Sequence, residues 1–473
     1  MKNLDIAVIG SGIGGSLISA LNSEKDLILF EKAHNLGGCA STFKRYGNFY
    51  NTGATTFVGY EEGHIVKNIF TKINIKPNLT KSDIAIRIIQ NNKTVDRIQD
   101  FEAFLEMVNQ NYFHKNNRIF WEKLREIDRK FWQLKKIYFG KFGVVHYSKT
   151  ALFIAELLQT FQFDLFKSAS CYIDEVLFNC TIEYKKFIDA QLLITVQTTS
   201  KDISLLSLAL GLSYPFHDVF YVNGGMGSLI SDILKDVEVK KNEEIYKIFK
   251  EKKSWRILSS KGEYLANRVV LNSTIYDSKK LFEDAKIKQY FESFHFSDTS
   301  AFVVYLTLEG NFELLHHYQI ILNQDIPNCI SNAFFISLSD NKDEKMSKNG
   351  LSVTISTHTK ASFWKDLQKD EYEKKKKETE FFIINKFLEY FDTIKIQNLK
   401  VSFSATSTTF NHFINRLNCG GKAIGLKNVT QLPSQNTPFK GLYNVGDTVF
   451  SGQGWPGVSL GVDLLHKELN KWI

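Results

Sequence analysis

The 473-residue sequence has few cysteines and no long apolar run, and each shortage excludes a class of protein. Its five cysteines are scattered and form no CxxC pair, so we expect neither a disulfide framework nor a structural zinc site. The expected compartment is a reducing one. No apolar stretch approaches the roughly 18 residues of a membrane span. The first apolar run, residues 4–10, contains Asp5 and ends in glycine, which is typical of a buried strand and not of a signal peptide.

Charge and composition indicate a globular protein. The net charge of +8 is modest for this length. It fits a cytoplasmic protein, or one that also contacts an anionic membrane surface, and requires no nucleic acid partner. The apolar fraction of 43% and the length predict two interleaved or successive domains. The 39 phenylalanines and 19 tyrosines either line a large apolar cavity or reflect a composition that is also rich in Lys, Asn and Ile.

The first thirty residues carry the strongest local signal, in the order strand, glycine loop, helix, strand and acid. Gly10, Gly12 and Gly15 form G-x-G-x-x-G, with Gly14 as an additional glycine. In such a loop the first glycine permits a tight turn, the second admits a pyrophosphate, and the third lets the helix pack closely on the strand. Glu31 closes the second strand, where a carboxylate binds ribose hydroxyls. The pattern predicts a dinucleotide with an unphosphorylated ribose, FAD or NAD.

A second glycine pair separates these two cofactors. Gly37 and Gly38 follow the ribose acid, with Ser41 and Thr42 just beyond. NAD domains have no need for this extension, whereas its backbone and hydroxyl groups could hold the diphosphate of FAD. The alternative is a glycine-rich surface turn.

In these motifs the sequence resembles the FAD-dependent phytoene desaturase and carotene isomerase family. Its likeness extends to Gln197-Thr198-Thr199, where the isomerase branch often has Gln-Thr-Pro. The resemblance implies an α/β fold: a Rossmann-type FAD-binding domain of the glutathione-reductase-like flavoprotein fold, with an interleaved, mixed α+β substrate domain. It also implies non-covalently bound FAD. Cys39 stands where the family commonly has Arg, which removes a phosphate partner that Lys32, Lys44 or Arg45 could replace.

A C-terminal stretch, residues 441–462, carries the second resemblance. It implies a strand that ends at Gly446 and Asp447, with Asp447 accepting hydrogen bonds from the ribityl hydroxyls. It further implies a helix whose N-terminus is aimed at the flavin, where it favours negative charge. The residues of this helix start are Gly454, Pro456, Gly457 and Val458. In the middle of the chain, the family's strand against the adenine implies a contact at Val239.

The sequence predicts a discontinuous domain organisation. The FAD-binding parts are residues 1–80, 221–275 and 401–473. Residues 81–220 form a largely helical cap over the substrate, and residues 276–400 add a sheet and a helix to the substrate domain. Within the cap, residues 118–142 have apolar residues at steps of three and four, with Trp121 and Trp132 and many basic residues. This helix either packs its apolar side on the core or lies on a membrane surface.

We therefore expect a flavoenzyme that acts on a long apolar polyene or isoprenoid-like lipid by desaturation, saturation or cis–trans isomerisation. It would be cytoplasmic, on the inner face of the membrane where it contacts lipid. An amine oxidase on the same fold and a flavin-binding protein without turnover are the alternatives. The sequence assigns no catalytic residue, and the histidines have no metal-ligand spacing, so no metal is expected. His412 is expected to be structural.

Overall fold

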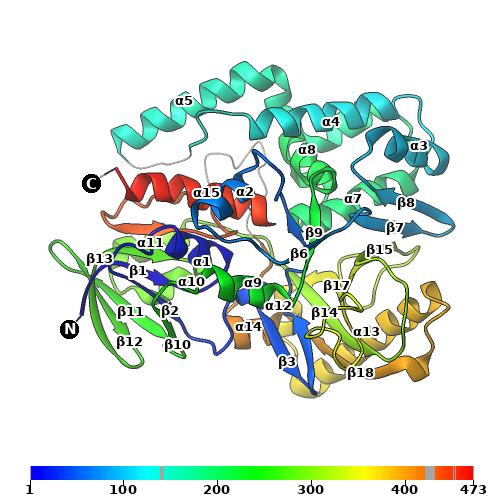
Figure 1. Cartoon of the computed structure of the whole chain (residues 1–473). Helices are drawn as coiled ribbons and strands as arrows, with labels where there is room; N and C mark the ends of the chain where they lie inside the picture. The colour runs from blue at the N-terminus through cyan, green and yellow to red at the C-terminus, as the bar shows by residue number, and fades with distance from the viewer. Residues whose placement is uncertain (1, 139–142, 421–431, 451, 453, 472–473) are drawn as a thin grey trace.

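The computed structural model describes residues 2–138, 143–420, 432–450, 452 and 454–471 (Figure 1). Two seven-stranded sheets dominate it, with helices between and around them. Within the described part of the chain, every helix is too short or too polar to cross a membrane.

The first sheet is the nucleotide sheet, and its strands come from three separate stretches of the chain. Its order is β10-β2-β1-β13-β12-β11, and β19 pairs with β13. The strands are β1 (Lys2–Ile9), β2 (Leu27–Glu31), β10 (Val239–Lys241), β11 (Ile245–Lys250), β12 (Trp255–Ser259), β13 (Gly262–Leu271) and β19 (Leu442–Asn444). Strands β10, β2, β1, β13 and β19 run parallel, and the β11-β12-β13 meander is antiparallel.

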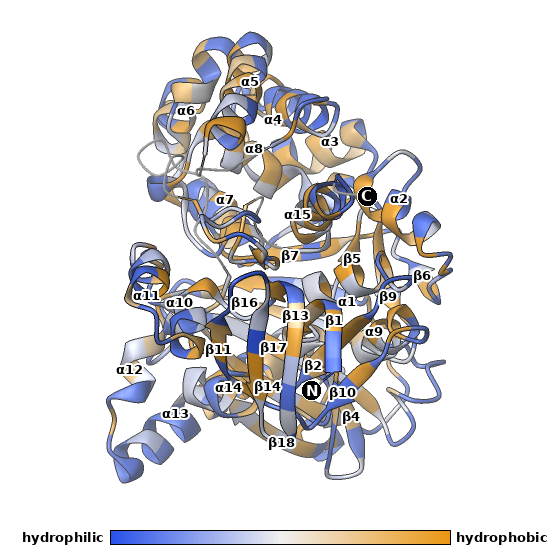
Figure 2. Cartoon of the chain, turned by 90° about the vertical axis from the view of Figure 1, so that its left-hand side faces the viewer, coloured by the Kyte–Doolittle hydropathy of each residue, from blue (hydrophilic) through white to orange (hydrophobic). Residues whose placement is uncertain are grey.

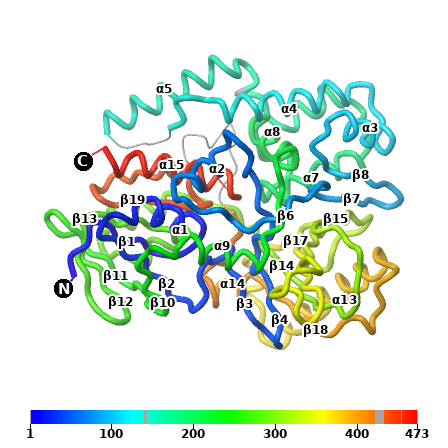
Figure 3. Tube along the Cα trace, viewed as in Figure 1, coloured from blue at the N-terminus to red at the C-terminus, as the bar shows by residue number. Residues whose placement is uncertain are grey.

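Both faces of this sheet are buried, as parallel strands require. Successive side chains of a strand point to opposite faces, so Ile6 and Val8 of β1 join one apolar cluster while Ala7 and Ile9 join another. The first cluster holds the helices that begin and end the chain, which lie side by side in Figure 3. The helices around the sheet are α1 (Ile13–Ala20), α2 (Ile65–Lys72), α9 (Met226–Ile233), α10 (Ile275–Ser278), α11 (Ala285–Glu292) and α15 (Gly454–Leu469).

The second sheet has the order β18-β14-β17-β16-β15-β7-β8 and is antiparallel except between β15 and β7. Its strands are β7 (Ile86–Gln90), β8 (Lys93–Arg97), β14 (Thr299–Leu308), β15 (His317–Ile321), β16 (Ala333–Leu338), β17 (Leu351–Lys360) and β18 (Leu399–Ala405). Helices α12 (Ala361–Lys365), α13 (Lys369–Tyr390) and α14 (Ser407–Ile414) accompany it, together with the short turn η6 (Ile396–Asn398). The expected division after residue 400 thus falls inside β18, and two strands of this sheet come from the stretch expected to be largely helical.

The helical part forms the upper end of the molecule in Figures 1 and 2. It consists of α3 (Phe101–Asn111), α4 (Asn117–Trp132), α5 (Val144–Phe161), η2 (Gln162–Phe166), α6 (Ala169–Val176), α7 (Ile182–Val196), η3 (Ser200–Asp202), α8 (Leu205–Ser213) and η4 (Tyr214–Phe216). Side-chain caps define several helix starts, because each oxygen accepts a backbone N–H of the first turn. These caps are Asp100, Ser168, Thr181 and Ser204.

The amphipathic helix predicted from residue 118 is α4, and its apolar side packs on the core. Phe120, Leu124, Ile127 and Phe131 are buried, and Trp121 is fully buried with its Nε1–H donating to Tyr184. The helix ends at Trp132, so the later apolar residues of the expected stripe lie beyond it. Because the apolar face is already covered, α4 offers no face to a membrane.

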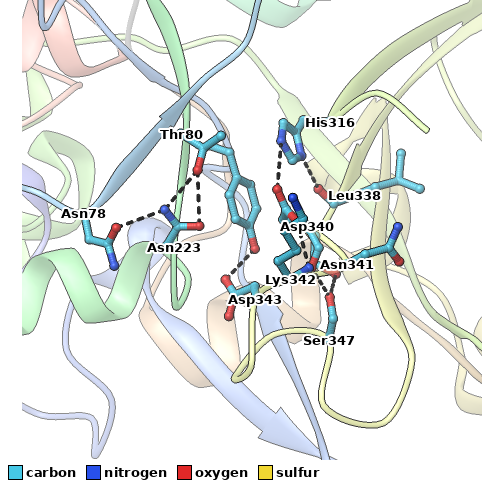
Figure 4. Close-up of polar contacts among 12 residues, drawn as sticks. Asn78, Thr80, Asn223, His316, Leu338, Asp340, Asn341, Lys342, Asp343 and Ser347 are labelled. Atoms are coloured by element: carbon cyan, nitrogen blue, oxygen red, sulfur yellow. Dashed lines mark hydrogen bonds and ion pairs between the residues drawn. The ribbon is translucent and has the colours of Figure 1, made fainter. Parts of the chain in front are cut away.

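Two small sheets connect the parts: β3 (Thr42–Arg45) with β4 (Asn48–Asn51), and β5 (Phe57–Val58)-β9 (Val219–Val222)-β6 (Leu79–Lys81). A loop after β16 is anchored to β9 through Asp343 (Figure 4). Its carboxylate accepts from Tyr221 Oη at 2.7 Å and from the Gly224 backbone N–H at 2.6 Å. The Gly224-Gly225 turn leads directly into α9.

Candidate active site and cofactor site

One large cavity, of about 770 Å³, lies where the nucleotide sheet, the second sheet and the helical part meet. One end is formed by the glycine loop after β1 and the acid after β2. The middle is formed by the start of α15. The far arm is formed by α4, α7, α8, β16, β17 and α14. A single cavity therefore joins the two predicted cofactor motifs to the predicted substrate region.

The glycine loop has the geometry that a dinucleotide needs. Gly10, Gly12 and Gly14 line the cavity, and the N-terminus of α1 begins at Ile13 within the same lining. Gly10 has φ +99°, a conformation that side chains disfavour. Gly15 does not line the cavity. A Cβ there would lie 2.0 Å from the Gly10 carbonyl oxygen, so its role is the close packing of α1 on β1.

Glu31 holds the glycine loop through hydrogen bonds. Its Oε2 accepts from the Ser11 backbone N–H at 2.9 Å and from Ser11 Oγ at 2.6 Å, and its Oε1 accepts from Ala33 N–H at 2.9 Å. A carboxylate offers about four acceptor positions, so roughly one remains for a ribose hydroxyl. Lys32 also lines the cavity, and its Nζ donates to Asn415 at 2.6 Å.

The segment with the second glycine pair faces the cavity only in part. Gly37 and Gly38 line the cavity, but Ser41 and Thr42 do not. Ser41 Oγ is bonded to Thr52 Oγ1 at 2.6 Å, and Thr42 Oγ1 accepts from the Gly227 backbone N–H at 2.9 Å. These two hydroxyls therefore hold the segment after η1 (Gly38–Ala40) against its neighbours instead of facing the cavity.

Val239 is also not part of the cavity lining. It lies in β10, where it pairs with Leu29 of β2. The chain reaches the cavity a few residues later, at residues 243–246, after the Glu243 backbone N–H has bonded the Glu31 carbonyl at 3.0 Å. The cavity lining next to Glu31 thus comes from the segment that follows β10.

The C-terminal motif meets Cys39 through an arginine that sequence reasoning missed. Gly446 and Asp447 line the cavity, and Arg416 binds Asp447 with two hydrogen bonds of 3.0 and 2.5 Å. Burial lowers the pKa of Arg416, but Asp447 outweighs this and raises the pKa well above its usual value. Arg416 also interacts with the Cys39 thiol, whose pKa is raised by burial. Lys44 and Arg45, two of the predicted replacements for the missing arginine, lie exposed on β3 outside the lining.

The start of α15 lies against the cavity as the motif predicts: Gly454, Pro456, Gly457 and Val458 all line it. Trp455, between them, is 1% exposed and packs edge-on against Phe57 with ring centroids 4.7 Å apart. This tryptophan therefore packs the turn into the core and also lines the cavity. The partial positive charge of the helix N-terminus favours an anionic group in the cavity.

The far arm of the cavity is mostly apolar. Its side chains include Phe131, Ile194, Val196, Leu210, Phe335 and Phe410. Gln197, at the left-handed end of α7 with φ +60°, connects two walls of this arm by accepting from His358 Nε2 at 2.8 Å. Burial lowers the pKa of His358 to about 4, so this histidine is neutral near pH 7.

A charged cluster interrupts the apolar wall. His217 lies between two carboxylates, with Nδ1 2.5 Å from Glu61 Oε1 and Nε2 3.0 Å from Asp128 Oδ2. Burial lowers the pKa of His217, but the hydrogen bonds to Asp128 and Glu61 raise it to about 10. His217 and Asp128 line the cavity. Sequence patterns gave no signal for this cluster, or for Arg416 and His358, because their partners are distant in the chain.

This arrangement defines a class of protein. A parallel sheet with a glycine loop and ribose acid, a second sheet, and a C-terminal helix that closes the same cavity form the fold of FAD-dependent oxidoreductases. The buried cradle fits the cofactor, since the glycine loop, Glu31 and the α15 start line one continuous cavity. The sequence profile described as flavin containing amine oxidoreductase matches residues 19–375. The chain belongs to that family and is an FAD-dependent enzyme.

The chain is similar to individual proteins along nearly its full length. It is 22% identical to the chloroplastic prolycopene isomerase of Arabidopsis thaliana, over 98% of this chain and 82% of the relative. Among solved structures, an oxidoreductase from Methanosarcina mazei has a TM-score of 0.67 at 16% identity, covering 99% of this chain and 100% of that one. The structure of putrescine oxidase bound to putrescine has a TM-score of 0.63 at 12% identity and covers 99% of this chain and 98% of that one. The CLA-producing fatty acid isomerase from P. acnes has a TM-score of 0.59 at 10% identity and covers 98% of each chain.

Proposed function

We propose that this enzyme acts on a long apolar polyene or isoprenoid-like lipid by desaturation, saturation or cis–trans isomerisation. The observation that carries the proposal is the apolar arm that continues from the α15 end of the cavity. Each CH₂ group buried there contributes about 0.8 kcal/mol, so a chain-like lipid gains affinity with length. The similarity to a prolycopene isomerase and to the fold of a fatty acid isomerase supports a substrate of this kind.

The chain's own residues define what each end of the cavity does. The glycine loop, Glu31 and the N-termini of α1 and α15 hold FAD, which supplies hydride transfer when bound. The proposal assigns the cofactor contacts to the residues that line the cavity. It does not use the predicted contacts of Ser41, Thr42 and Val239, which lie outside the lining. The apolar side chains of α7, α8 and β16 exclude water and align the substrate, while the Gln197–His358 pair supplies a neutral polar contact.

Anaerobic spectra of the FAD-loaded enzyme with a polyene test the reaction type. Loss of the oxidised flavin absorbance on mixing indicates desaturation. Isomerised product with an unchanged flavin, formed only after pre-reduction, indicates isomerisation. Leu210→Glu, which places a charge in the apolar arm, should abolish conversion while FAD binding persists, and Leu210→Met should retain both.

The alternative is an amine oxidase, which the family and the fold of putrescine oxidase leave open. It predicts hydrogen peroxide release with amines and no change in any polyene. That combination of results would overturn the lipid proposal. A flavin that stays unreactive toward both substrate classes and toward reductants would instead indicate a binding protein without turnover.

We further propose that the enzyme is cytoplasmic and contacts the inner membrane face through α5 and η2. Val144 and Phe163 are 85% and 89% exposed, and other apolar side chains of this region are exposed with them: Val145, Tyr147, Leu152, Ile154, Leu158 and Phe166. Both views in Figures 1 and 2 place α5 at the outer end of the molecule. Apolar side chains with Lys149 and Lys167 nearby in the chain suit an anionic lipid surface.

Vesicle sedimentation tests this contact. We expect the protein to sediment with anionic vesicles and less with neutral ones. The double variant V145E/L152E should stay in the supernatant, whereas Ile396→Glu, at an exposed apolar residue of η6, should bind like the wild type. Equal sedimentation of both variants would contradict the proposed surface.

A further inference from the structure

A group of potential metal ligands lies in the wall of the apolar arm. Glu61 and His64 belong to the loop between β5 and α2, and His217 lies between η4 and β9. The coordinating atoms of these three side chains all lie within 4.8 Å of one another. Sequence spacing alone could not reveal the group, because only Glu61 and His64 are close in the chain.

The separations bracket those of a tetrahedral ion site. Zinc bonds of about 2.0–2.1 Å place ligand atoms about 3.3–3.4 Å apart. His217 Nδ1 and Glu61 Oε1 are 2.5 Å apart, and no pair of ligand atoms exceeds 4.8 Å. The three ligand atoms are therefore within the range from which side-chain rotation could bring them onto one ion.

Two atoms of the group have unmet hydrogen-bonding capacity. His64 is 7% exposed, and its Nε2 is buried without a hydrogen-bond partner among the described residues. Its Nδ1 accepts from the Val66 backbone N–H at 3.3 Å at the start of α2, so in the ion-free ring Nε2 carries the proton, and Zn²⁺ binding at Nε2 displaces that proton and breaks the Val66 hydrogen bond. Glu61 Oε2 is likewise buried and without a partner there. Buried polar atoms usually have a partner, so these two show that the group has room for a further polar ligand.

An outer carboxylate orients His217. The second ring nitrogen, Nε2, lies 3.0 Å from Asp128 Oδ2, and Asp128 Oδ1 accepts from Trp132 Nε1 at 3.1 Å. A carboxylate that fixes the far nitrogen of a histidine is the usual support of a metal-ligating imidazole, because it sets the ring orientation and raises its basicity. Asp128 is therefore a positioning residue of the group.

We propose that Glu61, His64 and His217 bind one Zn²⁺ ion, with Asp128 as the outer-shell support. Two imidazoles and one carboxylate suit zinc, whereas Mg²⁺ and Ca²⁺ prefer sites made of oxygen. The ion connects the loop before α2 to the start of β9 and, through Asp128, to α4. It thereby fixes the wall of the apolar arm beside Trp132. This inference concerns a site separate from the flavin and does not depend on the identity of the substrate.

Metal binding to the purified full chain tests the site directly. We expect calorimetry to show one Zn²⁺ per chain, and Co²⁺ to give the intense visible bands of a tetrahedral site. Mg²⁺ should not compete. His64→Gln and His217→Gln should each abolish stoichiometric binding, and Asp128→Asn should weaken it about 10- to 100-fold. His412→Gln, at an exposed histidine of α14, is the matched control and should bind like the wild type.

Each outcome of these measurements either supports the zinc site or overturns it. A wild-type chain that binds no Zn²⁺ stoichiometrically overturns the proposal, whatever the variants do. Binding that survives both histidine substitutions in chains with wild-type circular dichroism also overturns it, because the ion then sits elsewhere. If a histidine variant fails to fold, the Zn²⁺-induced rise in Tm decides: Glu61→Gln and Asp128→Asn must reduce it, and the control must not. FAD content is recorded in parallel, so that loss of the cofactor is distinguished from loss of the ion.

Discussion

Arg416 and Asp447 form an ion pair with two hydrogen bonds on the wall of the cofactor cavity, next to the Cys39 thiol. Cys39 occupies the sequence position where the resembling family commonly has arginine. Arg416 lies in the segment that follows α14, yet its guanidinium reaches the Cys39 thiol on the cavity wall. A positive charge absent from the second glycine motif is thus supplied in space by a distant residue.

Mutation can test whether Arg416 takes the place of the arginine that the family commonly has at the position of Cys39. Arg416→Leu leaves Asp447 without its partner and removes the buried cation, so we expect FAD affinity to fall at least tenfold, that is by more than about 1.4 kcal/mol. Adding C39R to that variant should restore part of the loss. The measurement is titration of the apo-protein with FAD, followed by flavin fluorescence. Lys44→Ala, on the exposed strand β3, should have no effect; an Arg416 variant with wild-type affinity would refute the assigned role.

The close approach of α1 to β1 predicts a position where a single methyl group is not tolerated. In Gly15→Ala the new Cβ would lie 2.0 Å from the Gly10 carbonyl oxygen, so α1 must move and distort the glycine loop. We expect little folded protein and no bound FAD. Gly262→Ala, where a Cβ meets nothing within 4 Å, should match the wild type in yield and flavin absorbance. Normal flavin loading of the Gly15 variant would argue against the tight packing.

Buried neutral histidines predict acid sensitivity. His317 is 1% exposed, and burial together with the nearby His316 lowers its pKa from 6.5 to about 3. The unfolded chain therefore binds a proton below pH 6.5 that the folded chain does not. The stability contributed by neutral His317 is complete above pH 6.5 and is lost as the pH falls toward 3.

Urea unfolding between pH 6 and pH 4 measures this loss. The free energy of unfolding should fall less steeply in His317→Gln than in the wild type, by up to about 1.4 kcal/mol per pH unit. His64 and His358, whose pKa values burial lowers to about 4, act in the same direction, so part of the slope remains. An unchanged slope would show that His317 is hydrated or already charged.

The helical part depends on one fully buried arginine. Arg97 of β8 donates to Gln191 Oε1 of α7 and to the Leu212 carbonyl of α8 at 2.6 Å, and it is 0% exposed. Burial lowers its pKa to about 9. Arg97→Met keeps much of the volume but leaves two buried acceptors unpaired, at a cost of about 2–4 kcal/mol.

Arg97→Ala should be worse than Arg97→Met, because it also removes packing against the rings of Phe104, Trp121 and Phe216. Thermal unfolding measures both, with a lower Tm expected in each. Arg87→Met, at a half-exposed arginine of the neighbouring strand β7, should lower Tm much less. Equal effects at the two arginines would contradict the importance of burial.

Local patterns predicted the nucleotide half of the protein well. The glycine spacing and Glu31 define a strand, loop, helix and strand whose geometry depends on neighbouring residues alone, and the α15 start lies on the same cavity. Side-chain periodicity also predicted α4, and the sheet and helix expected in residues 276–400 correspond to β14–β17 and α13. These features depend on short-range sterics and on one buried face, and both are visible in a window of ten to twenty residues.

What the sequence could not predict depends on contacts between distant segments. Ser41 and Thr42 have the chemistry of phosphate ligands, but Thr52 and the start of α9 use their hydroxyls. Val239 lies in the edge strand β10 outside the cavity lining, which the chain reaches at residues 243–246, so its contact with the adenine stays a prediction. Trp121 and Trp132 have the chemistry of membrane anchors, but Trp121 is buried in the helical part and Trp132 lines the cavity.

The insertion of β19 beside β13 has a consequence for synthesis of the protein. Until Leu442–Asn444 have left the ribosome, part of the β13 edge has no partner, and α1 lacks the helix that packs on it. The first strand and glycine loop are made hundreds of residues earlier, but they cannot enclose the cofactor by themselves. FAD can therefore be enclosed only after the C-terminal segment has joined the sheet and packed on α1.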